Sequence, residues 1–364
     1  METGERYPLA APLWRSSSGG LLDVEFEARL APARIAGRPA SLWRYREALP
    51  ITRDDAMVSF GEGMTPLVPT LFAGRKVYFK LEYLFPTGSY KDRGATVLLS
   101  KVRELGVERI VEDSSGNAGA AIACYAARAG IACDIYVPAG TSAAKLTQIE
   151  LFGARLHQVP GTRADAARAA FEAAQTTYYA SHCWNPFFFQ GTKTFAFEVV
   201  EQLGWTAPDA IIIPTGNGTL LYGTWLGLRE LRDAGIIDRL PKLIAVQAEH
   251  CAPLYEAWRA GRTDIGPVAA RDTVAEGIAI AAPVRARQCL QAVRETEGRF
   301  IVVSEGEIRH ALREMLTQGF FIEPTAAAAV AGLLKYNAPN ARIVVPLTGH
   351  GLKAADKLAR LAAD

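Results

Sequence analysis

The fold of this chain is restricted most by an alternation that begins near residue 75, in which short β-branched runs alternate with alanine-rich stretches of helical length. This alternation is typical of parallel strands joined by helices, so we expect an α/β protein built on mostly parallel sheets flanked by helices. The expected strands are 76–81, 109–112, 133–137, 155–159, 210–214, 243–247, 300–303 and 342–346. The expected helices include 92–105, 117–129, 164–174 and 219–232.

The length and composition are those of a globular protein with more than one domain. The chain has 364 residues, of which 49% are hydrophobic and 21% are charged. A chain of this length and hydrophobic content can form two hydrophobic cores. Its 40 basic and 38 acidic side chains are scattered along the chain, so nucleic acid is not an expected partner. No membrane segment is expected either, because Pro214 and Gly216 interrupt the longest uncharged run, 210–228.

The five cysteines indicate a reducing compartment. Their number is odd, they form no CxxC pair, and no secretion signal precedes them. We therefore expect a cytoplasmic protein without a disulfide framework.

Segment 86–94 places a lysine at the start of an expected helix. It reads Pro-Thr-Gly-Ser-Tyr-Lys-Asp-Arg-Gly, and Lys91 follows its turn-forming residues. A lysine held near apolar residues can act as a neutral amine nucleophile toward an aldehyde. An ordinary solvated lysine at a helix start is the alternative interpretation of this segment.

Two further segments pass from an expected strand into an expected helix through glycines and small polar residues. Segment 112–119 contains Ser114, Ser115 and Asn117, and its hydroxyls and backbone N–H groups suit an anion such as a carboxylate. Segment 214–220, Pro-Thr-Gly-Asn-Gly-Thr-Leu, has glycines that let backbone N–H groups approach a phosphate. It lacks the third glycine and the acidic residue of a dinucleotide-binding motif. Taken alone, each segment also fits a plain strand-to-helix turn.

Taken together, these segments stand in the order found in fold-type II pyridoxal phosphate enzymes. The sequence around Lys91 resembles the S-[FY]-K-D-R-G motif of that family, and 61–67 resembles its G-E-G-x-T-P-L segment. Residues 348–353 resemble the T-G-H-G-L-K ending of threonine synthases. The resemblance implies a two-lobed α/β enzyme of the threonine synthase-like group, with pyridoxal 5'-phosphate as cofactor, a small amino acid as substrate and a homodimeric assembly.

The resemblance also implies roles for individual residues. Lys91 holds the cofactor as a Schiff base and later moves protons on the substrate. The other implied cofactor contacts are Asn117 at the 3'-oxygen, Thr348 at the pyridine nitrogen, and a phosphate loop made of Thr215, Gly216, Asn217, Gly218, Thr219 and Leu220. The implied substrate contacts are Ser114, Ser115, Asn117 and Ala118 at the carboxylate, together with Asn185, Phe188 and Lys193.

Phe188 departs from the threonine synthase pattern. Those enzymes bind the phosphate of O-phosphohomoserine partly with the arginine of an N-P-[WFY]-R segment, whereas 185–188 reads Asn-Pro-Phe-Phe here. An apolar ring cannot neutralise a dianion. The candidate substitute cations are Lys193, Arg163 and Arg93.

Three functions are compatible with these observations. Threonine synthase activity, which converts O-phosphohomoserine and water to threonine and phosphate, is favoured by the whole-chain resemblance. A β-eliminating or β-replacing enzyme for serine, threonine, diaminopropionate or O-phosphoserine is favoured by Phe188 and by segment 275–280, which resembles that of dehydratases and racemases. The third function is that of a catalytically silent binding protein, against which Lys91 and the phosphate loop argue.

We expect the chain to divide into an arm and two domains. Residues 1–58 resemble a zinc-ribbon remnant, but serines stand at 16–18 where a zinc site requires thiolates, so no metal is expected. Residues 59–95 with 191–364 are expected to form a large cofactor-binding domain, and 96–190 a small domain. The reason is that cofactor segments from opposite ends of the chain must converge at the carboxyl ends of strands.

Overall fold

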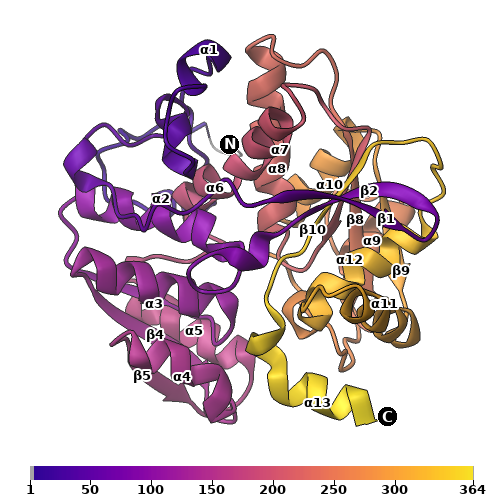
Figure 1. The fold of residues 1–364 in the computed structure, drawn as a ribbon. Helices are drawn as coiled ribbons and strands as arrows, with labels where there is room; N and C mark the ends of the chain where they lie inside the picture. The colour runs from indigo at the N-terminus through magenta and orange to yellow at the C-terminus, as the bar shows by residue number, and fades with distance from the viewer. Residues whose placement is uncertain (1–3, 364) are drawn as a thin grey trace. The chain divides into compact units, whose positions relative to one another are not determined.

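The computed structural model describes residues 4–363 (Figure 1). The chain forms two compact units. The first unit contains the chain up to Gly63 and Lys91–Thr192, and the second contains Met64–Tyr90 and Lys193–Asp364. Each unit has its own sheet and its own hydrophobic core.

The first unit is built on a parallel four-stranded sheet. In spatial order, the strands are β5 (Arg155–Val159), β4 (Ala132–Pro138), β3 (Arg109–Glu112) and β6 (Tyr178–Tyr179). The helices are α1 (Pro32–Ile35), α2 (Lys91–Glu104), α3 (Asn117–Ala129), α4 (Ala143–Leu151), α5 (Arg163–Ala173) and α6 (Pro186–Thr192), with 3₁₀ turns at Leu42–Ala48 and Asp54–Ala56.

Helix α3 illustrates how the sequence specifies these elements. Its alanine-rich composition favours the helical state, and Gly130 ends it in a left-handed conformation with φ 70° that glycine adopts without strain. The buried face of α3 packs with that of α2 in the core of the first unit. This packing fixes the N-terminus of α3 next to the end of β3.

The second unit is built on a six-stranded sheet. In spatial order, the strands are β1 (Leu67–Phe72), β2 (Arg75–Lys80), β10 (Ile343–Pro346), β7 (Ala210–Pro214), β8 (Lys242–Ala248) and β9 (Arg299–Val303). Only the β1–β2 hairpin is antiparallel. The helices are α7 (Thr194–Gln202), α8 (Thr219–Asp233), α9 (Pro253–Arg259), α10 (Ala286–Glu295), α11 (Glu305–Thr317), α12 (Pro324–Lys335) and α13 (Ala355–Ala363), with 3₁₀ turns at Glu82–Leu84, Glu276–Ile278 and Gly351–Ala354.

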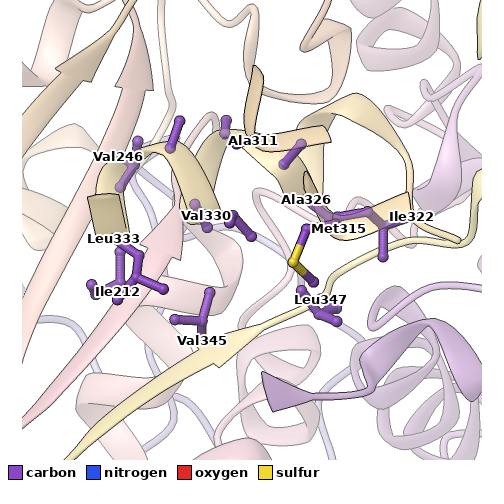
Figure 2. Close-up of a cluster of buried hydrophobic side chains, with 14 of the residues drawn as sticks. Ile212, Val246, Ala311, Met315, Ile322, Ala326, Val330, Leu333, Val345 and Leu347 are labelled. Carbon is purple, nitrogen blue, oxygen red and sulfur yellow. The ribbon is translucent and has the colours of Figure 1, made fainter. Parts of the chain in front are cut away.

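Side chains from the sheet and from α11 and α12 form the core of the second unit (Figure 2). Ile212, Val246 and Val345 come from three neighbouring strands, and Val330 and Leu333 come from α12. All of these side chains are fully buried. The core therefore fixes β7 and β10 side by side, and with them the loops that follow both strands.

The structure confirms the predicted α/β class and every expected strand, with each end within one residue of its expected position. Sequence patterning missed β1 and β6. Strand β1 is an edge strand that contains Pro69, which weakens a strand pattern, and β6 has only two residues. Among residues 4–363, no helix combines the length and the apolar character needed to cross a membrane.

The serines at 16–18 form a hydrogen-bonded turn in the first unit. Ser16 Oγ accepts a hydrogen bond from the N–H of Gly20 at 2.9 Å. Ser17 and Ser18 donate through their hydroxyls to Glu5 at 3.1 Å and 3.3 Å. Hydroxyl groups thus link this turn to the preceding segment at the positions where a zinc ribbon carries thiolates.

Candidate active site

The second unit carries a glycine-rich loop between β7 and α8. Gly218 is the N-cap of α8, with φ 73°, and as a glycine it offers no side chain to cap the helix. A Cβ atom on Gly218 would lie 2.1 Å from Sγ of Cys289, and one on Gly216 would lie 2.8 Å from Cα of Ile278. Both positions therefore require glycine. The positive end of a 15-residue helix opens on this loop, which is the arrangement that binds phosphate groups.

Two buried hydroxyl groups lie at the end of the neighbouring strand, β10. Thr348 follows β10, and Ser89 pairs with Gly349 in an antiparallel bridge. Neither the Oγ1 atom of Thr348 nor the Oγ atom of Ser89 has a hydrogen-bond partner among residues 4–363. A buried polar atom without a partner costs about 1–3 kcal/mol, so these hydroxyls indicate a place where a ligand supplies polar atoms.

Tyr90 links this pair of hydroxyls to the glycine-rich loop. Its backbone N–H donates to the carbonyl of Thr348 at 3.1 Å. Its hydroxyl shares a hydrogen bond of 2.7 Å with Oγ1 of Thr219, the first residue of α8. The residue immediately before Lys91 is therefore held at the end of β10 and at the start of α8.

Lys91 is the first residue of α2 in the first unit. Its Nζ atom lies 5.8 Å from the centre of the Phe188 ring, within the range of a cation–π contact. Phe188 is fully buried, and a Cβ atom on Gly94 would lie 2.4 Å from its ring. The ring thus packs directly on the backbone of α2, one turn after Lys91.

Of the predicted carboxylate-binding residues, Ser114 and Ser115 lie in the loop between β3 and α3, and Asn117 and Ala118 are the first two residues of α3. The N–H of Gly116 donates to Oγ of Ser114 at 3.3 Å. A Cβ atom on Gly119 would lie 1.8 Å from the carbonyl oxygen of Ser114, so the loop folds tightly onto the first turn of α3. The structure therefore brings these four residues together at the positive end of α3.

A cluster of buried polar groups lies directly before this loop. His182 Nδ1 and Glu112 Oε1 are 2.6 Å apart, and the hydroxyl of Tyr179 donates to Oδ1 of Asp113 at 2.8 Å. One ligand-type atom each from Glu112, Asp113 and His182 lies within 4.8 Å of the others. Burial raises the pKa of Glu112 to about 8, raises the pKa of Asp113 and lowers the pKa of His182 well below its usual range.

Asn185 and Lys193 are buried and hydrogen-bonded within their own units. Nδ2 of Asn185 donates to Tyr178 and Tyr179, and its Oδ1 accepts from the N–H of Phe187 at 3.2 Å, so its amide holds β6 to the start of α6. In the second unit, Nζ of Lys193 donates to Glu230 at 2.7 Å, and burial lowers the pKa of Lys193.

Sequence reasoning assigned no role to Ser89, Tyr90, Glu112 or His182. A polar residue at the end of an expected buried strand is the signal that could have identified Glu112. His182 follows the two-residue strand β6, which has no detectable pattern, so its pairing with Glu112 was not predictable.

Comparison with known proteins gives the same class as the geometry. The family model described as pyridoxal-phosphate dependent enzyme matches residues 58–349. The chain therefore belongs to the family of pyridoxal-phosphate dependent enzymes, and pyridoxal phosphate is its cofactor.

Two similar relatives are called threonine synthase. The protein of Methanocaldococcus jannaschii is 36% identical over 378 residues, which covers 99% of this chain and 93% of the relative. The protein of Mycobacterium tuberculosis is 36% identical over 331 residues, which covers 87% and 89%. The chain is thus a threonine synthase-like, pyridoxal phosphate-dependent lyase.

Solved structures of the same fold include a fungal L-serine ammonia-lyase from Rhizomucor miehei, with a TM-score of 0.72, 23% identity, and coverage of 83% of this chain and 98% of that one. Threonine deaminase isoform 2 from Solanum lycopersicum has a TM-score of 0.71, 22% identity, and coverage of 95% and 98%. These similarities show the fold.

The residues of the second unit fit this cofactor. Its phosphate requires close backbone approach at a helix N-terminus, which the loop of Gly216 and Gly218 offers. Its ring nitrogen requires a polar partner in an apolar surrounding, which the buried hydroxyls of Thr348 and Ser89 offer.

Proposed function

We propose that this enzyme converts O-phosphohomoserine and water to threonine and phosphate, and that Lys91 is the residue that carries the cofactor. The support is the match over nearly the whole chain to relatives called threonine synthase. The single structural observation that carries the cofactor assignment is the anchoring of Tyr90, next to Lys91 in the chain, to Thr348 and Thr219.

Residues 215–220 and Thr348 are proposed to hold the cofactor in the second unit. The loop N–H groups bind the phosphate, and the Thr348 hydroxyl binds the ring nitrogen. A hydroxyl at that nitrogen, unlike a carboxylate, does not hold it protonated. When bound, pyridoxal phosphate withdraws electrons from the carbon atoms of an attached amino acid. Asn117 is proposed to orient the cofactor through its 3'-oxygen.

The first unit is proposed to bind and orient the substrate. Ser114, Ser115, Asn117 and Ala118 surround the positive end of α3, where a substrate carboxylate gains hydrogen bonds and a favourable field. Lys91 is proposed to take a proton from the substrate and return it at another carbon, since its amine is the nucleophile of this site.

The leaving phosphate needs a cation, and the structure favours Arg163 among the candidates. Lys193 is fully buried and paired with Glu230, whose side chain is 21% exposed. Arg163 is exposed at the start of α5, and its charge opposes the rise that burial causes in the pKa values of Glu112 and Asp113, at the end of β3. We therefore propose that Arg163 binds the phosphate of the substrate.

A second candidate function is β-elimination or β-replacement on a small amino acid with an uncharged leaving group. The observation that favours it is Phe188, whose buried ring stands where threonine synthases have an arginine. Glu276, in the segment that resembles dehydratases, is paired with Lys357.

A substrate panel separates the two candidates. Wild-type enzyme is assayed against O-phosphohomoserine, O-phosphoserine, serine, threonine and 2,3-diaminopropionate, with phosphate, threonine and keto-acid release as readouts. Threonine and phosphate from O-phosphohomoserine support the main proposal, and keto-acid release from the other substrates supports the second. An Arg163→Ala variant should raise KM for the phosphorylated substrate only, and no turnover of any substrate would support the silent binding protein.

We also propose a cellular compartment, an oligomeric state and a role for each unit of this enzyme. All five cysteines are buried thiols, which suits a reducing, cytoplasmic compartment. The homodimer implied by the family resemblance is part of the same proposal. We further propose that the second unit is the cofactor-binding domain and that the first unit carries the substrate loop.

A further inference from the structure

A buried carboxyl and a buried imidazole in the first unit have no part in the proposed function. Glu112 is the last residue of β3, and His182 lies three residues beyond β6, its parallel neighbour. The carboxyl ends of parallel strands meet at one edge of a sheet, so the fold brings these distant residues together. Their hydrogen bond is 2.6 Å long, and both partners are buried: Glu112 is 0% exposed and His182 is 3% exposed.

The surroundings of this hydrogen bond disfavour charge. Oε2 of Glu112 has no hydrogen-bond partner among residues 4–363, and an ionised carboxylate with an unpartnered oxygen is costly in a protein interior. Burial raises the pKa of Glu112 to about 8 and lowers the pKa of His182 far below its usual range. At neutral pH the pair is therefore a protonated carboxyl and a neutral imidazole.

Charged groups face Glu112 from two helices and from its own strand. The backbone N–H of His182, the charges of Arg163 of α5 and Lys91 of α2, and the backbone N–H of Asp113 favour its ionised form, but burial outweighs them. Burial and the charge of an ionised Glu112 both raise the pKa of Asp113. The remaining titratable groups that face Glu112 are neutral because burial raises their pKa values: Cys133 of β4, Tyr179 of β6 and Cys183.

The ring centres of His182 and Phe188 are 6.1 Å apart, and Nζ of Lys91 lies 5.8 Å from the centre of the same Phe188 ring, so the Glu112–His182 pair and Lys91 border one ring. A negative charge on Glu112 would therefore favour the ammonium form of Lys91.

We propose that His182 is a positioning residue that holds Glu112 in its uncharged form, so that no carboxylate charge faces Lys91 when Lys91 binds the cofactor. This inference rests on the proposed role of Lys91. An amine must lose a proton before it attacks an aldehyde, and a nearby carboxylate favours the ammonium form. Because burial raises the pKa of Glu112 to about 8, most of this charge is absent at neutral pH.

The test measures cofactor capture by apoprotein between pH 6 and pH 9.5, using the visible absorbance of lysine-bound cofactor. Glu112→Gln is uncharged at every pH. Once Glu112 is ionised, the wild type should capture the cofactor more slowly than this variant by on the order of tenfold, because one pKa unit of interaction lowers the fraction of neutral Lys91 about tenfold. His182→Ala removes the partner and should move this loss of rate to lower pH. His182→Asn keeps a hydrogen-bonding atom near the Nδ1 position and should restore the wild-type profile.

A second readout does not need the cofactor. Carbon-13 and nitrogen-15 NMR of the apoprotein should show a neutral His182 at pH 7 and a Glu112 carboxyl that titrates near pH 8. His157→Asn is the matched control, since His157 also bonds a carboxyl of this unit, Asp134 at 2.7 Å, but is 29% exposed. That variant should leave the pH profile of capture unchanged.

Identical pH profiles for the wild type and Glu112→Gln would overturn the inference and leave the proposed function intact. A His182 that is protonated at pH 7 would overturn it as well. So would stoichiometric divalent metal in the purified protein that Glu112→Gln loses, because the three clustered groups would then hold an ion instead of a proton. If the wild type captures no cofactor at Lys91 at any pH, the proposed function fails and this inference fails with it.

Discussion

The hydroxyl of Tyr90 and Oγ1 of Thr219 lie 2.7 Å apart in the second unit. This hydrogen bond joins the residue before Lys91 to the first residue of α8, at the positive end of that helix. It therefore couples the placement of the lysine backbone to the loop proposed to bind the cofactor phosphate.

Replacing Tyr90 with phenylalanine removes this link without changing the size of the ring. We expect an apoprotein that is less stable by about 1 kcal/mol and that binds pyridoxal phosphate roughly 5- to 10-fold more weakly, which is the usual size of one hydrogen bond. Equilibrium dialysis measures the affinity. Tyr78→Phe on β2 is the control. An equal loss of cofactor affinity in that variant would show that the effect is not specific to the hydrogen bond between Tyr90 and Thr219.

Lys91→Ala should abolish the visible absorbance of lysine-bound cofactor, because in this proposal no other amine is positioned to form the bond. Absorbance after gel filtration and borohydride trapping followed by peptide mapping measure the effect. Lys76→Ala, on β2, should retain the absorbance. A band that persists in Lys91→Ala and is trapped on another lysine would refute the assignment.

Thr348→Val tests the unpartnered hydroxyl. Its Oγ1 atom makes no hydrogen bond to residues 4–363, so its loss should leave the stability of the apoprotein unchanged or higher by up to about 1 kcal/mol. Cofactor affinity should fall roughly 5- to 10-fold, measured by absorbance titration. Thr296→Val is the matched control, because the Thr296 hydroxyl is also buried but does have a protein partner: it donates to the carbonyl of Ala292 at 2.8 Å. This variant should lower the stability of the apoprotein. Full cofactor affinity in Thr348→Val would contradict the assigned contact.

The fold was predictable from sequence wherever a strand is buried on both faces. The expected strands 210–214 and 243–247 contain the apolar runs 210–213 and 243–246, and the structure confirms both strands. The hairpin partner β1 was missed because an edge strand with Pro69 carries no such run.

The candidate site was predictable only where one short segment carries the chemistry. The loops at 114–118 and 215–220 join a strand to a helix, so their positions followed from local pattern. The bond of Glu112 to His182 depends on β6 pairing beside β3, and the bond of Tyr90 to Thr219 depends on the spatial order of the second sheet. No local pattern contains such long-range contacts.

The stability of the apoprotein should depend on pH through Glu112. Its pKa is raised from 4.5 to about 8 by burial, so between these values the folded state binds more protons than the unfolded state. Stability is then lost as pH rises through this window. Glu112→Gln removes the effect, and the variant should gain on the order of 2–4 kcal/mol relative to the wild type from pH 5 to pH 9.

Urea unfolding at four pH values measures this difference. Glu25→Gln is the control, because that side chain is 80% exposed and should change stability by the same small amount at every pH. A difference between the wild type and Glu112→Gln that did not vary with pH would show that Glu112 is ionised in the folded protein.

The last prediction concerns Phe188 and the substrate. Its ring is fully buried, contacts Gly94 and lies 5.8 Å from Nζ of Lys91. An arginine at this position would place a second cation in a buried space beside Lys91, and the neighbouring carboxyl of Glu112, bonded to His182, is proposed to be uncharged there. We expect Phe188→Arg to destabilise the protein by about 3–5 kcal/mol, whereas Leu151→Arg, at a position 81% exposed in the same unit, should change stability by less than about 1 kcal/mol.

The same variant tests how the substrate phosphate is bound. Because Arg163 is proposed to bind that phosphate, Phe188→Arg should not improve turnover of O-phosphohomoserine, and Phe188→Leu, which keeps an apolar side chain in this buried space, should preserve most of it. Urea unfolding and phosphate release measure the two effects. A stable Phe188→Arg enzyme that used O-phosphohomoserine better than the wild type, and uncharged substrates worse, would show that Phe188 faces the substrate and that the wild-type enzyme prefers an uncharged leaving group.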